Sequence, residues 1–189
     1  TVNPAIPSYS DVGIFDWYYE GVTYVSEKGL MSGMGDGTFA PNTALSREMM
    51  ATILWNMAGK PEAKDVAPFL DVTSDKYYAE AIAWANENDI VSGYGDTFGV
   101  GQPITREQFA VMLYNYAVFK GYDTTQGGMA IREFTDFEKI SDYPVTAMTW
   151  AVNNGIIGGY EDGSLRPQGG ATRAEAAVML MNFYKNTAK

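Results

Sequence analysis

An internal threefold repeat is the strongest constraint that this sequence places on its fold. The segment "GMGDGTFAPNTALSREMM" recurs as "GYGDTFGVGQPITREQF" and again as "GYEDGSLRPQGGATRAEA", with the copies about sixty residues apart. A single unit of this size buries too little apolar surface to be stable alone. We therefore expect three copies of one supersecondary unit that share a core.

Two amphipathic helices are predicted in each copy, so the expected fold class is all-α, built of helix–loop–helix repeats. Apolar or small residues recur at i, i+3, i+4 and i+7, the spacing of one helix face. In the first helices they are Tyr18, Gly21, Val22, Val25; Tyr78, Ala81, Ile82, Ala85; and Pro144, Ala147, Met148, Ala151. In the second helices they are Met50, Ile53, Leu54, Met57; Phe109, Met112, Leu113, Tyr116; and Ala176, Met179, Leu180, Phe183. Gly29, Asp89 and Gly155 lie where the first helix should end.

The alignment of the copies sets the expected boundaries. They are an N-terminal lead at 1–10, repeats at 11–59, 69–119 and 134–185, and linkers at 60–68 and 120–133. Because the first residue is threonine and not methionine, we expect a processed chain. Within each repeat a loop of roughly fifteen residues connects the two helices, and a loop that long in a compact unit is usually functional.

Charge and composition exclude several classes of function. The chain has 13 basic and 23 acidic side chains and a net charge of −10, whereas nucleic acids and anionic membranes are bound by basic surfaces. The absence of cysteine and histidine excludes disulfides, thiolate zinc sites and Ser-His or Cys-His catalytic pairs. No stretch reaches the ~18 apolar residues of a membrane span. We expect no metal, no cofactor, no nucleic-acid partner and no membrane insertion.

The second helix of each copy begins with the same unusual pair. A Ser or Thr, which is a good N-cap residue, is followed at once by arginine. The pairs are Ser46 and Arg47, Thr105 and Arg106, and Thr172 and Arg173. Gln108 and Glu175 complete a capping box in the second and third copies, whereas Met49 breaks it in the first. Capping explains the hydroxyl residues, but it does not explain why three of only five arginines stand here.

Two interpretations of these arginines remain open. A cation in the first helical turn opposes the helix dipole, at a cost on the order of 0.3–1 kcal/mol. In one interpretation the guanidinium, the hydroxyl and free backbone N–H groups bind an anion, such as a carboxylate or phosphate. Arg106 would then be exposed, and Arg106→Ala should change stability by no more than about 0.5 kcal/mol. In the other, the arginine is structural and donates hydrogen bonds to loop carbonyls.

The repeat also carries a family resemblance. The patterns "F-x-D-V", "A-I-x-W-A-x-x-x-x-I-V-x-G-Y-x-D-x-x-F" and "I-T-R-E" or "A-T-R-A-E" resemble the S-layer homology family in three tandem copies, over roughly residues 11 to 185. The resemblance implies a pseudo-threefold spindle with a central three-helix bundle. It also implies a secreted, non-catalytic, carbohydrate-binding module on the cell wall or S-layer surface. Such a module is expected to be a monomeric part of a larger surface protein.

The resemblance further implies a ligand and a site. Grooves between repeats would bind secondary cell-wall polysaccharide, typically through a terminal pyruvate-ketal sugar. By position, the binding role falls on Arg47, Arg106 and Arg173, with Ser46, Thr105 and Thr172 beside them. The first two copies read Ser-Arg-Glu-Met and Thr-Arg-Glu-Gln where the family has Thr-Arg-Ala-Glu. The third copy has Glu161 where the others have glycine, so the three grooves need not all be competent.

Loop residues are further candidates for the binding site. Tyr94 and Tyr160 follow the in-register glycine, and their rings either stack on sugar C–H surfaces or pack locally. Asp36, Asp96 and Asp162 either orient the arginines, accept hydrogen bonds from sugar hydroxyls, or form turns. A calcium loop is not favoured, because the EF-hand pattern is missing. Tyr24, Trp84 and Trp150 are expected to pack in the core or between repeats.

Repetition itself argues against catalysis. A glycosidase needs one pair of carboxylates about 5–10 Å apart, whereas every distinctive feature here occurs three times. A binding module is therefore favoured over an enzyme. Two alternatives to polysaccharide remain, namely peptidoglycan itself and a protein partner of a cell-surface scaffold.

Overall fold

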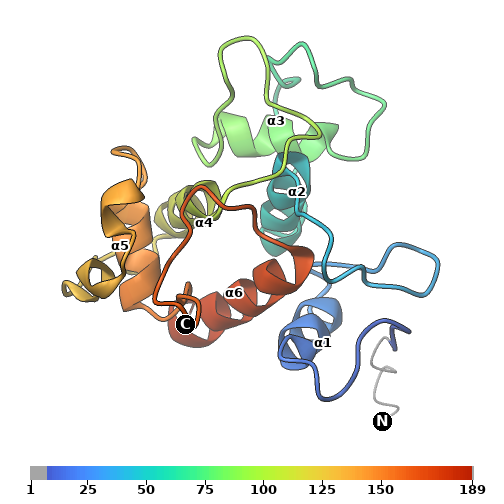
Figure 1. Cartoon of the computed structure of the whole chain (residues 1–189). Helices are drawn as coiled ribbons and strands as arrows, with labels where there is room; N and C mark the ends of the chain where they lie inside the picture. Colours follow the sequence, from blue (N-terminus) through green and yellow to red (C-terminus); the bar gives the residue numbers. More distant parts are fainter. Residues whose placement is uncertain (1–7, 189) are drawn as a thin grey trace.

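The computed structural model describes residues 8–188 and contains two α-helices in each repeat (Figure 1). The helices are α1 (Tyr19–Glu27), α2 (Arg47–Met57), α3 (Ala79–Glu87), α4 (Arg106–Lys120), α5 (Val145–Asn153) and α6 (Arg173–Asn186). Two 3₁₀ turns, η1 (Ala130–Glu133) and η2 (Phe137–Lys139), precede α5. Over the described residues, β structure is limited to isolated bridges. The all-α class is confirmed, and each helix lies where the apolar spacing predicts it.

The helix ends follow the expected local chemistry. Gly29, Asp89 and Gly155 have φ values of 66°, 58° and 63°, so the left-handed conformation follows each first helix. The N-cap hydroxyls of the second helices accept from the backbone N–H three residues later, at Met49, Gln108 and Glu175. Complete capping boxes form at α4 and α6 but not at α2. The capping predictions are therefore confirmed in all three repeats.

The helices pack between repeats in a closed order. Each first helix lies against the second helix of the repeat before it, as α3 lies against α2 and α5 against α4. In the same way α1 lies against α6, so the first repeat packs on the last (Figure 1). The array therefore closes on itself, and the buried apolar residues of all three repeats join in one cluster over residues 8–188.

Backbone hydrogen bonds join the three repeats just before their second helices. The N–H of Leu45 donates to the carbonyl of Ala171 at 2.8 Å, that of Ile104 to Leu45 at 2.8 Å, and that of Ala171 to Ile104 at 3.1 Å. Each residue donates to one repeat and accepts from the other, and all three side chains are buried. This cyclic set brings the N-termini of α2, α4 and α6 together.

Aromatic side chains fill the space between paired helices. Trp150 is fully buried, with its ring 5.4 Å from that of Tyr114 and 6.2 Å from that of Phe183. Trp84 is also buried, and Tyr24 of α1 contacts Tyr184 of α6 with ring centroids 6.0 Å apart. The expected packing role of these aromatic residues is confirmed.

The loop between the helices is held by the opening motif of each repeat. In the second repeat the carboxylate of Asp71 accepts from the backbone N–H of Phe98, Gly99 and Val100. The ring of Phe69 lies on Gly93, where an added Cβ would be only 2.4 Å from the ring. The other repeats place Asp11 with Tyr9 and Asp136 with Phe134 in the same way. The "F-x-D-V" motif thus fixes the loop that lines the candidate site.

Candidate functional site

Three equivalent pockets lie between the repeats, and each is lined by residues of all three repeats. We number them groove 1, groove 2 and groove 3, after the repeat that supplies the loop and the second helix. Groove 2 combines the loop residues Ile90–Tyr94, the α4 residues Gln108, Val111, Met112 and Asn115, Arg47 of repeat 1 and Tyr143 of repeat 3. Groove 1 combines Leu30–Met34, Met49, Thr52, Ile53 and Asn56 with Arg173 of repeat 3 and Tyr77 of repeat 2. Groove 3 combines Ile156, Gly158, Gly159, Tyr160, Glu161, Glu175, Val178, Met179 and Asn182 with Arg106 of repeat 2 and Trp17 of repeat 1.

The repeated arginine forms part of the inner wall of each groove and links two repeats. Nε of Arg47 donates to the carbonyl of Phe98 at 2.9 Å, and Nη2 donates to that of Ser92 at 2.8 Å. The equivalent pairs join Arg106 to Leu165 and Gly158, and Arg173 to Phe39 and Ser32, at 2.7–2.8 Å. Each arginine therefore holds two points within the loop of the following repeat. The structural interpretation of the arginines accounts for these bonds.

The expectation that Arg106 is exposed is wrong. Its exposed fraction is 4%, the same as that of Arg47, and Arg173 is 6% exposed. The helical side chain lies across the interface between repeats, because the loop of the next repeat folds over the helix start. Loss of the guanidinium would leave the buried carbonyl of Leu165 and the partly buried carbonyl of Gly158 without this donor, so Arg106→Ala is expected to lower stability.

The first backbone N–H group of each second helix is also occupied. In α4 the N–H of Arg106 donates to Gly169 and that of Glu107 to Pro167, both at 2.9 Å. In α6 the first two N–H groups donate to Thr43 and Pro41, and in α2 the first donates to Gln102. Loop carbonyls thus take the positions where an anion was expected to meet free N–H groups. At each helix start the arginine side chain lines the groove of the following repeat.

The electrostatic surroundings of the three arginines differ. Burial lowers the pKa of Arg47 and Arg173, because desolvation disfavours the charged form. Among residues 8–188, the only carboxylate within 4.0 Å of any of the three guanidinium groups is that of Glu175, which lies 3.6 Å from Nη1 of Arg106. The charges of Arg47 and Arg173 are therefore not neutralised by an ion pair in the described part of the chain.

Aromatic rings cover the arginines. The guanidinium carbon of Arg47 lies 4.6 Å from the ring centroid of Tyr94, and that of Arg106 lies 4.8 Å from that of Tyr160. Both tyrosines line their grooves, so the structure brings these two predicted residues to the arginines. The ring face of each tyrosine that lies toward the arginine makes a cation–π contact, and such contacts stabilise a partly buried cation.

A second set of aromatic residues was not singled out from the sequence. Trp17, Tyr77 and Tyr143 each lie two residues before a first helix, and each forms the rim of a groove in another repeat. Their exposed fractions are 66%, 63% and 63%, which is high for such large rings. The in-register aromatic position was a usable signal. Which groove each ring would line was not predictable, because that depends on how the repeats pack around one another.

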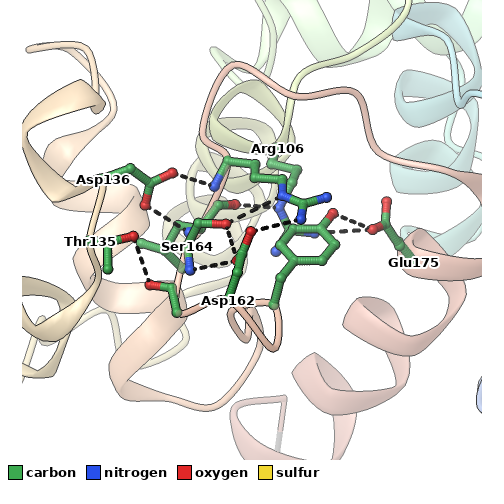
Figure 2. Close-up of polar contacts among 10 residues, drawn as sticks. Arg106, Thr135, Asp136, Asp162, Ser164 and Glu175 are labelled. Atoms are coloured by element: carbon green, nitrogen blue, oxygen red, sulfur yellow. Dashed lines mark hydrogen bonds and ion pairs between the residues drawn. The ribbon is translucent and has the colours of Figure 1, made fainter.

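The predicted aspartates lie outside the grooves. Asp36 accepts from the backbone N–H of Thr38 at 3.0 Å, and Asp162 accepts from that of Ser164 at 3.0 Å. Asp162 also accepts from the hydroxyl of Ser164 at 2.6 Å (Figure 2) and from Nη2 of Arg166 at 3.0 Å. These hydrogen bonds, that of the Ser164 hydroxyl above all, lower the pKa of the Asp162 carboxyl to about 2. Asp96 supplies a backbone carbonyl to the N–H of Leu70. These contacts support the turn interpretation of the three residues.

Comparison with known proteins identifies the family. The model of the S-layer homology domain matches residues 8–51, 68–110 and 133–177, which together are more than half of the chain. The chain belongs to the S-layer homology family. Its three matches coincide with the three repeats that line the grooves.

Relatives of this S-layer homology chain are parts of much longer proteins. It is 31% identical over 171 residues to the surface-layer 125 kDa protein of Lysinibacillus sphaericus, covering 88% of the chain and 14% of that protein. It is 28% identical to the cellulosome-anchoring protein of Acetivibrio thermocellus, over 79% of the chain and 34% of that protein. It is 27% identical to the amylopullulanase of Thermoanaerobacterium thermosulfurigenes, covering 91% and 9%. The chain thus spans about a third or less of the length of these relatives.

In the described part of the chain, no helix has the length and apolar character that crossing a membrane requires.

Within the S-layer homology motif, the third helical residue distinguishes the grooves. It is Met49 in groove 1, Gln108 in groove 2 and Glu175 in groove 3. In groove 2 the side-chain amide of Gln108 donates to the hydroxyl of Tyr94 at 2.6 Å. In groove 3 the hydroxyl of Tyr160 donates to the carboxylate of Glu175 at 2.5 Å, beside Arg106 (Figure 2). The three grooves therefore share a framework but differ in charge.

Proposed function

We propose that this chain is a non-catalytic anchoring module that binds secondary cell-wall polysaccharide through the carboxylate of a terminal pyruvate-ketal sugar. The observation that carries the proposal is the position of Arg47 and Arg173. Each is a buried cation that lines a groove and has no carboxylate partner in the described chain. A buried charge without a partner strongly favours a ligand of opposite charge.

The geometry of groove 2 suits a small acidic group on a sugar. Nε and Nη2 of Arg47 hold loop carbonyls, so Nη1 is the nitrogen that faces the ligand in the proposed complex. Tyr94 and Tyr143 flank the arginine and offer ring faces to the C–H surface of a sugar. Because so little of the guanidinium is exposed, the acidic group must protrude from the sugar ring to reach it. A ketal-linked pyruvyl carboxylate has this shape.

The proposal assigns a supporting role to the N-cap hydroxyls. Ser46, Thr105 and Thr172 accept helix N–H groups and hold the arginine that follows them. Their contribution to the ligand is then indirect, through the orientation of the guanidinium. Asp36, Asp96 and Asp162 have no part in the proposed complex, since they line none of the three grooves.

The proposed arrangement of the repeats is a pseudo-threefold spindle with α2, α4 and α6 at its centre. The cyclic hydrogen bonds among Leu45, Ile104 and Ala171 support this symmetry, and so does the recurrence of one groove design in three copies. Three grooves on one module allow several chain ends to be held at once. Avidity then gives firm attachment from weak individual sites.

The names of the relatives support attachment to the cell surface as the biological role. They include a surface-layer protein and a cellulosome-anchoring protein, and the module accounts for only a part of each. By analogy, this chain anchors the protein to which it belongs and leaves any other activity to other domains.

Calorimetric titration of the intact chain with purified wall polysaccharide tests the proposal. The titration is run before and after mild acid treatment that removes the ketal groups. We expect binding before treatment and at least a tenfold loss of affinity after it. Equal binding to both samples would place the affinity in neutral sugars. Absence of binding to either would favour peptidoglycan or a protein partner, which separate titrations with each then distinguish.

A further inference from the structure

An apolar tip, formed by Ile14 and Phe15 in the turn before α1, departs from the repeat pattern outside the grooves. The side chain of Phe15 is 95% exposed and that of Ile14 is 67% exposed. The backbone N–H of Gly13 donates to Oδ2 of Asp16 at 2.7 Å, and that of Asp16 donates to the carbonyl of Gly13 at 3.0 Å, so the turn is held in place. The other two repeats have polar residues at the position of Phe15, namely Asp75 and Ser141.

A second departure is a pocket on the outer face of α3, beneath the linker of residues 60–68, which we call the outer pocket. Its volume is ≈ 700 Å³, larger than that of any of the three grooves. Its apolar lining consists of Ala63, Val66, Ala67, Val72, Ala79 and Ala83. Because Val66 is 82% exposed, the outer pocket opens at the surface.

Small side chains on α3 leave the outer pocket wide. Ala79 and Ala83 stand where α1 has Tyr19 and Thr23, and those two residues line an equivalent pocket of only ≈ 180 Å³. The larger side chains thus occupy in repeat 1 the space that is open in repeat 2.

Repeat 3 shows which kind of group fits this helix face. There the short turn η1 packs on α5, and its residue Ile131 is only 3% exposed. Ile131 lies three residues before Phe134, and the corresponding residue three positions before Phe69 is Val66, which stays exposed. Repeat 3 therefore covers its first helix with an apolar side chain from a turn, and repeat 2 lacks that cover.

We infer that the apolar tip of one copy of this chain docks in the outer pocket of a second copy, so that the modules associate head to tail. The tip does not reach the outer pocket of its own chain, because α1 packs on α6 and α3 packs on α2, in separate parts of the molecule (Figure 1). Tip and pocket are different surfaces, so the contact is heterologous and leaves a free tip and a free pocket at the ends. The inference does not depend on what the three grooves bind.

The charges beside the tip and in the outer pocket favour this contact. Between residues 8 and 20 the chain has three carboxylates and no lysine or arginine. Lys64 and Lys76 line the outer pocket. Lys76 lies 3.4 Å from Asp75, whereas Lys64 has no carboxylate within 4.0 Å among residues 8–188. Lys64 is therefore the cation available to Asp16 of the second copy.

Two acidic residues, Asp65 and Glu80, also line the outer pocket. Oε1 of Glu80 accepts from the backbone N–H of Ala63 at 2.7 Å, so this carboxylate is engaged with the linker. Asp65 is exposed, and the interactions of exposed charges are weak in water. Burial of the Phe15 ring against the alanine side chains is thus the main contribution to docking.

The area of one docked ring predicts a weak contact. An aromatic side chain buries about 150–250 Å², whereas each partner of a stable complex buries about 800 Å². Association is therefore expected only toward millimolar concentration. Copies tethered close together reach this range, because effective concentrations in tethered systems are on the order of 1 mM.

Sedimentation equilibrium of the intact chain from about 10 µM to about 2 mM tests the inference. The weight-average mass should rise with concentration and exceed that of a dimer, because a head-to-tail contact continues from copy to copy. Phe15→Ser removes the ring, and Ala79→Tyr fills the outer pocket with the side chain that α1 has at this position. Either variant alone should stay monomeric over the whole range.

An equimolar mixture of these two variants gives the sharper result. Phe15→Ser keeps an intact pocket and Ala79→Tyr keeps an intact tip, so the mixture should reach the mass of a dimer and stop there. Val118→Ser, which removes a 54% exposed apolar side chain outside the tip and the pocket, should associate like the unmodified chain. Urea unfolding verifies the fold of each variant, and Ala83→Leu replaces Ala79→Tyr if the latter is unstable.

Three results would overturn the inference. One is a constant monomer mass of the unmodified chain up to the highest concentration. Another is association that persists in Phe15→Ser or in the folded variant with a filled pocket. The third is a mixture of the two variants that stays monomeric while the unmodified chain associates.

Discussion

At the scale of single residues, the repeated arginine has a structural role and, in the proposed function, a binding role. The arginine that the sequence marks by repetition is first a structural link, since two of its nitrogens hold carbonyls of the neighbouring repeat. Only the third nitrogen, Nη1, is left for a ligand. Removal of the side chain is therefore a poor test of binding, because it also disrupts the interface that forms the groove.

We predict that Arg106→Ala lowers the free energy of unfolding by about 1–4 kcal/mol, because the buried carbonyl of Leu165 and the partly buried carbonyl of Gly158 lose their donor, and a fully buried unmet group costs about 1–3 kcal/mol. Urea unfolding followed by circular dichroism measures the change. The matched control is Arg132→Ala, at an exposed position, which should change stability by less than about 0.5 kcal/mol. A loss below about 1 kcal/mol for Arg106→Ala would contradict the linking role.

Gly93 is a second residue on which the groove depends. An added Cβ would lie 2.4 Å from both the Phe69 ring and the carbonyl oxygen of Thr97, and the backbone oxygen cannot move aside easily. We predict that Gly93→Ala destabilises the chain by about 1–3 kcal/mol, the usual cost of overpacking. Gly128→Ala is the control, because its Cβ would meet no atom within 4 Å. Equal unfolding free energies for the two variants would show that the loop adapts.

At the scale of helices, each element serves two repeats. The helix α5 of repeat 3 packs against α4 of repeat 2, and the segment that leads into α5 places Tyr143 on the rim of groove 2. Tyr143 is 63% exposed, so its side chain contributes little to the packed core. Replacement of Tyr143 therefore tests binding without disrupting the interface between repeats, which replacement of an arginine does not.

We predict that Tyr143→Ala weakens binding of the ketal sugar at groove 2 by about 3- to 10-fold, since an aromatic contact is worth about 0.5–1.5 kcal/mol. Its effect on the free energy of unfolding should stay below about 0.5 kcal/mol. Calorimetry and urea unfolding measure the two quantities. Phe15→Ala, which removes a ring that is 95% exposed and lines none of the three grooves, should change neither. Unchanged affinity in Tyr143→Ala would remove the rim aromatics from the proposed site.

The helices and their caps were predictable because they depend on local chemistry. The spacing of apolar residues placed α1 through α6, and the Ser or Thr before each arginine placed the caps. The role of the arginines was not decided by sequence, because their acceptors are backbone carbonyls of another repeat, and carbonyls carry no residue signature. Trp17, Tyr77 and Tyr143 were missed for a related reason. Their place on a groove follows from which helix packs on which, and a repeat pattern alone does not determine that.

At the scale of the whole molecule, closure distinguishes this array from an open stack of repeats. In an open stack, loss of a terminal repeat removes one increment of stability and leaves the remaining repeats folded. Here α6 provides the surface on which α1 packs, and Arg173 holds the loop of the first repeat. Loss of the third repeat would therefore expose apolar surface at both ends of what remains.

We predict that a fragment of residues 8–132, which keeps the first two repeats, does not fold cooperatively. It leaves α1 without α6 and α4 without α5, and it breaks the cyclic bonds at Leu45 and Ile104. Circular dichroism should show low helicity and a broad urea transition, whereas the intact chain should unfold in one sharp transition. Addition of a separate fragment of residues 133–189 should restore helicity, because it supplies the missing partners without a covalent link. If the two-repeat fragment unfolds cooperatively with about two thirds of the stability of the intact chain, the repeats stack additively and closure contributes little.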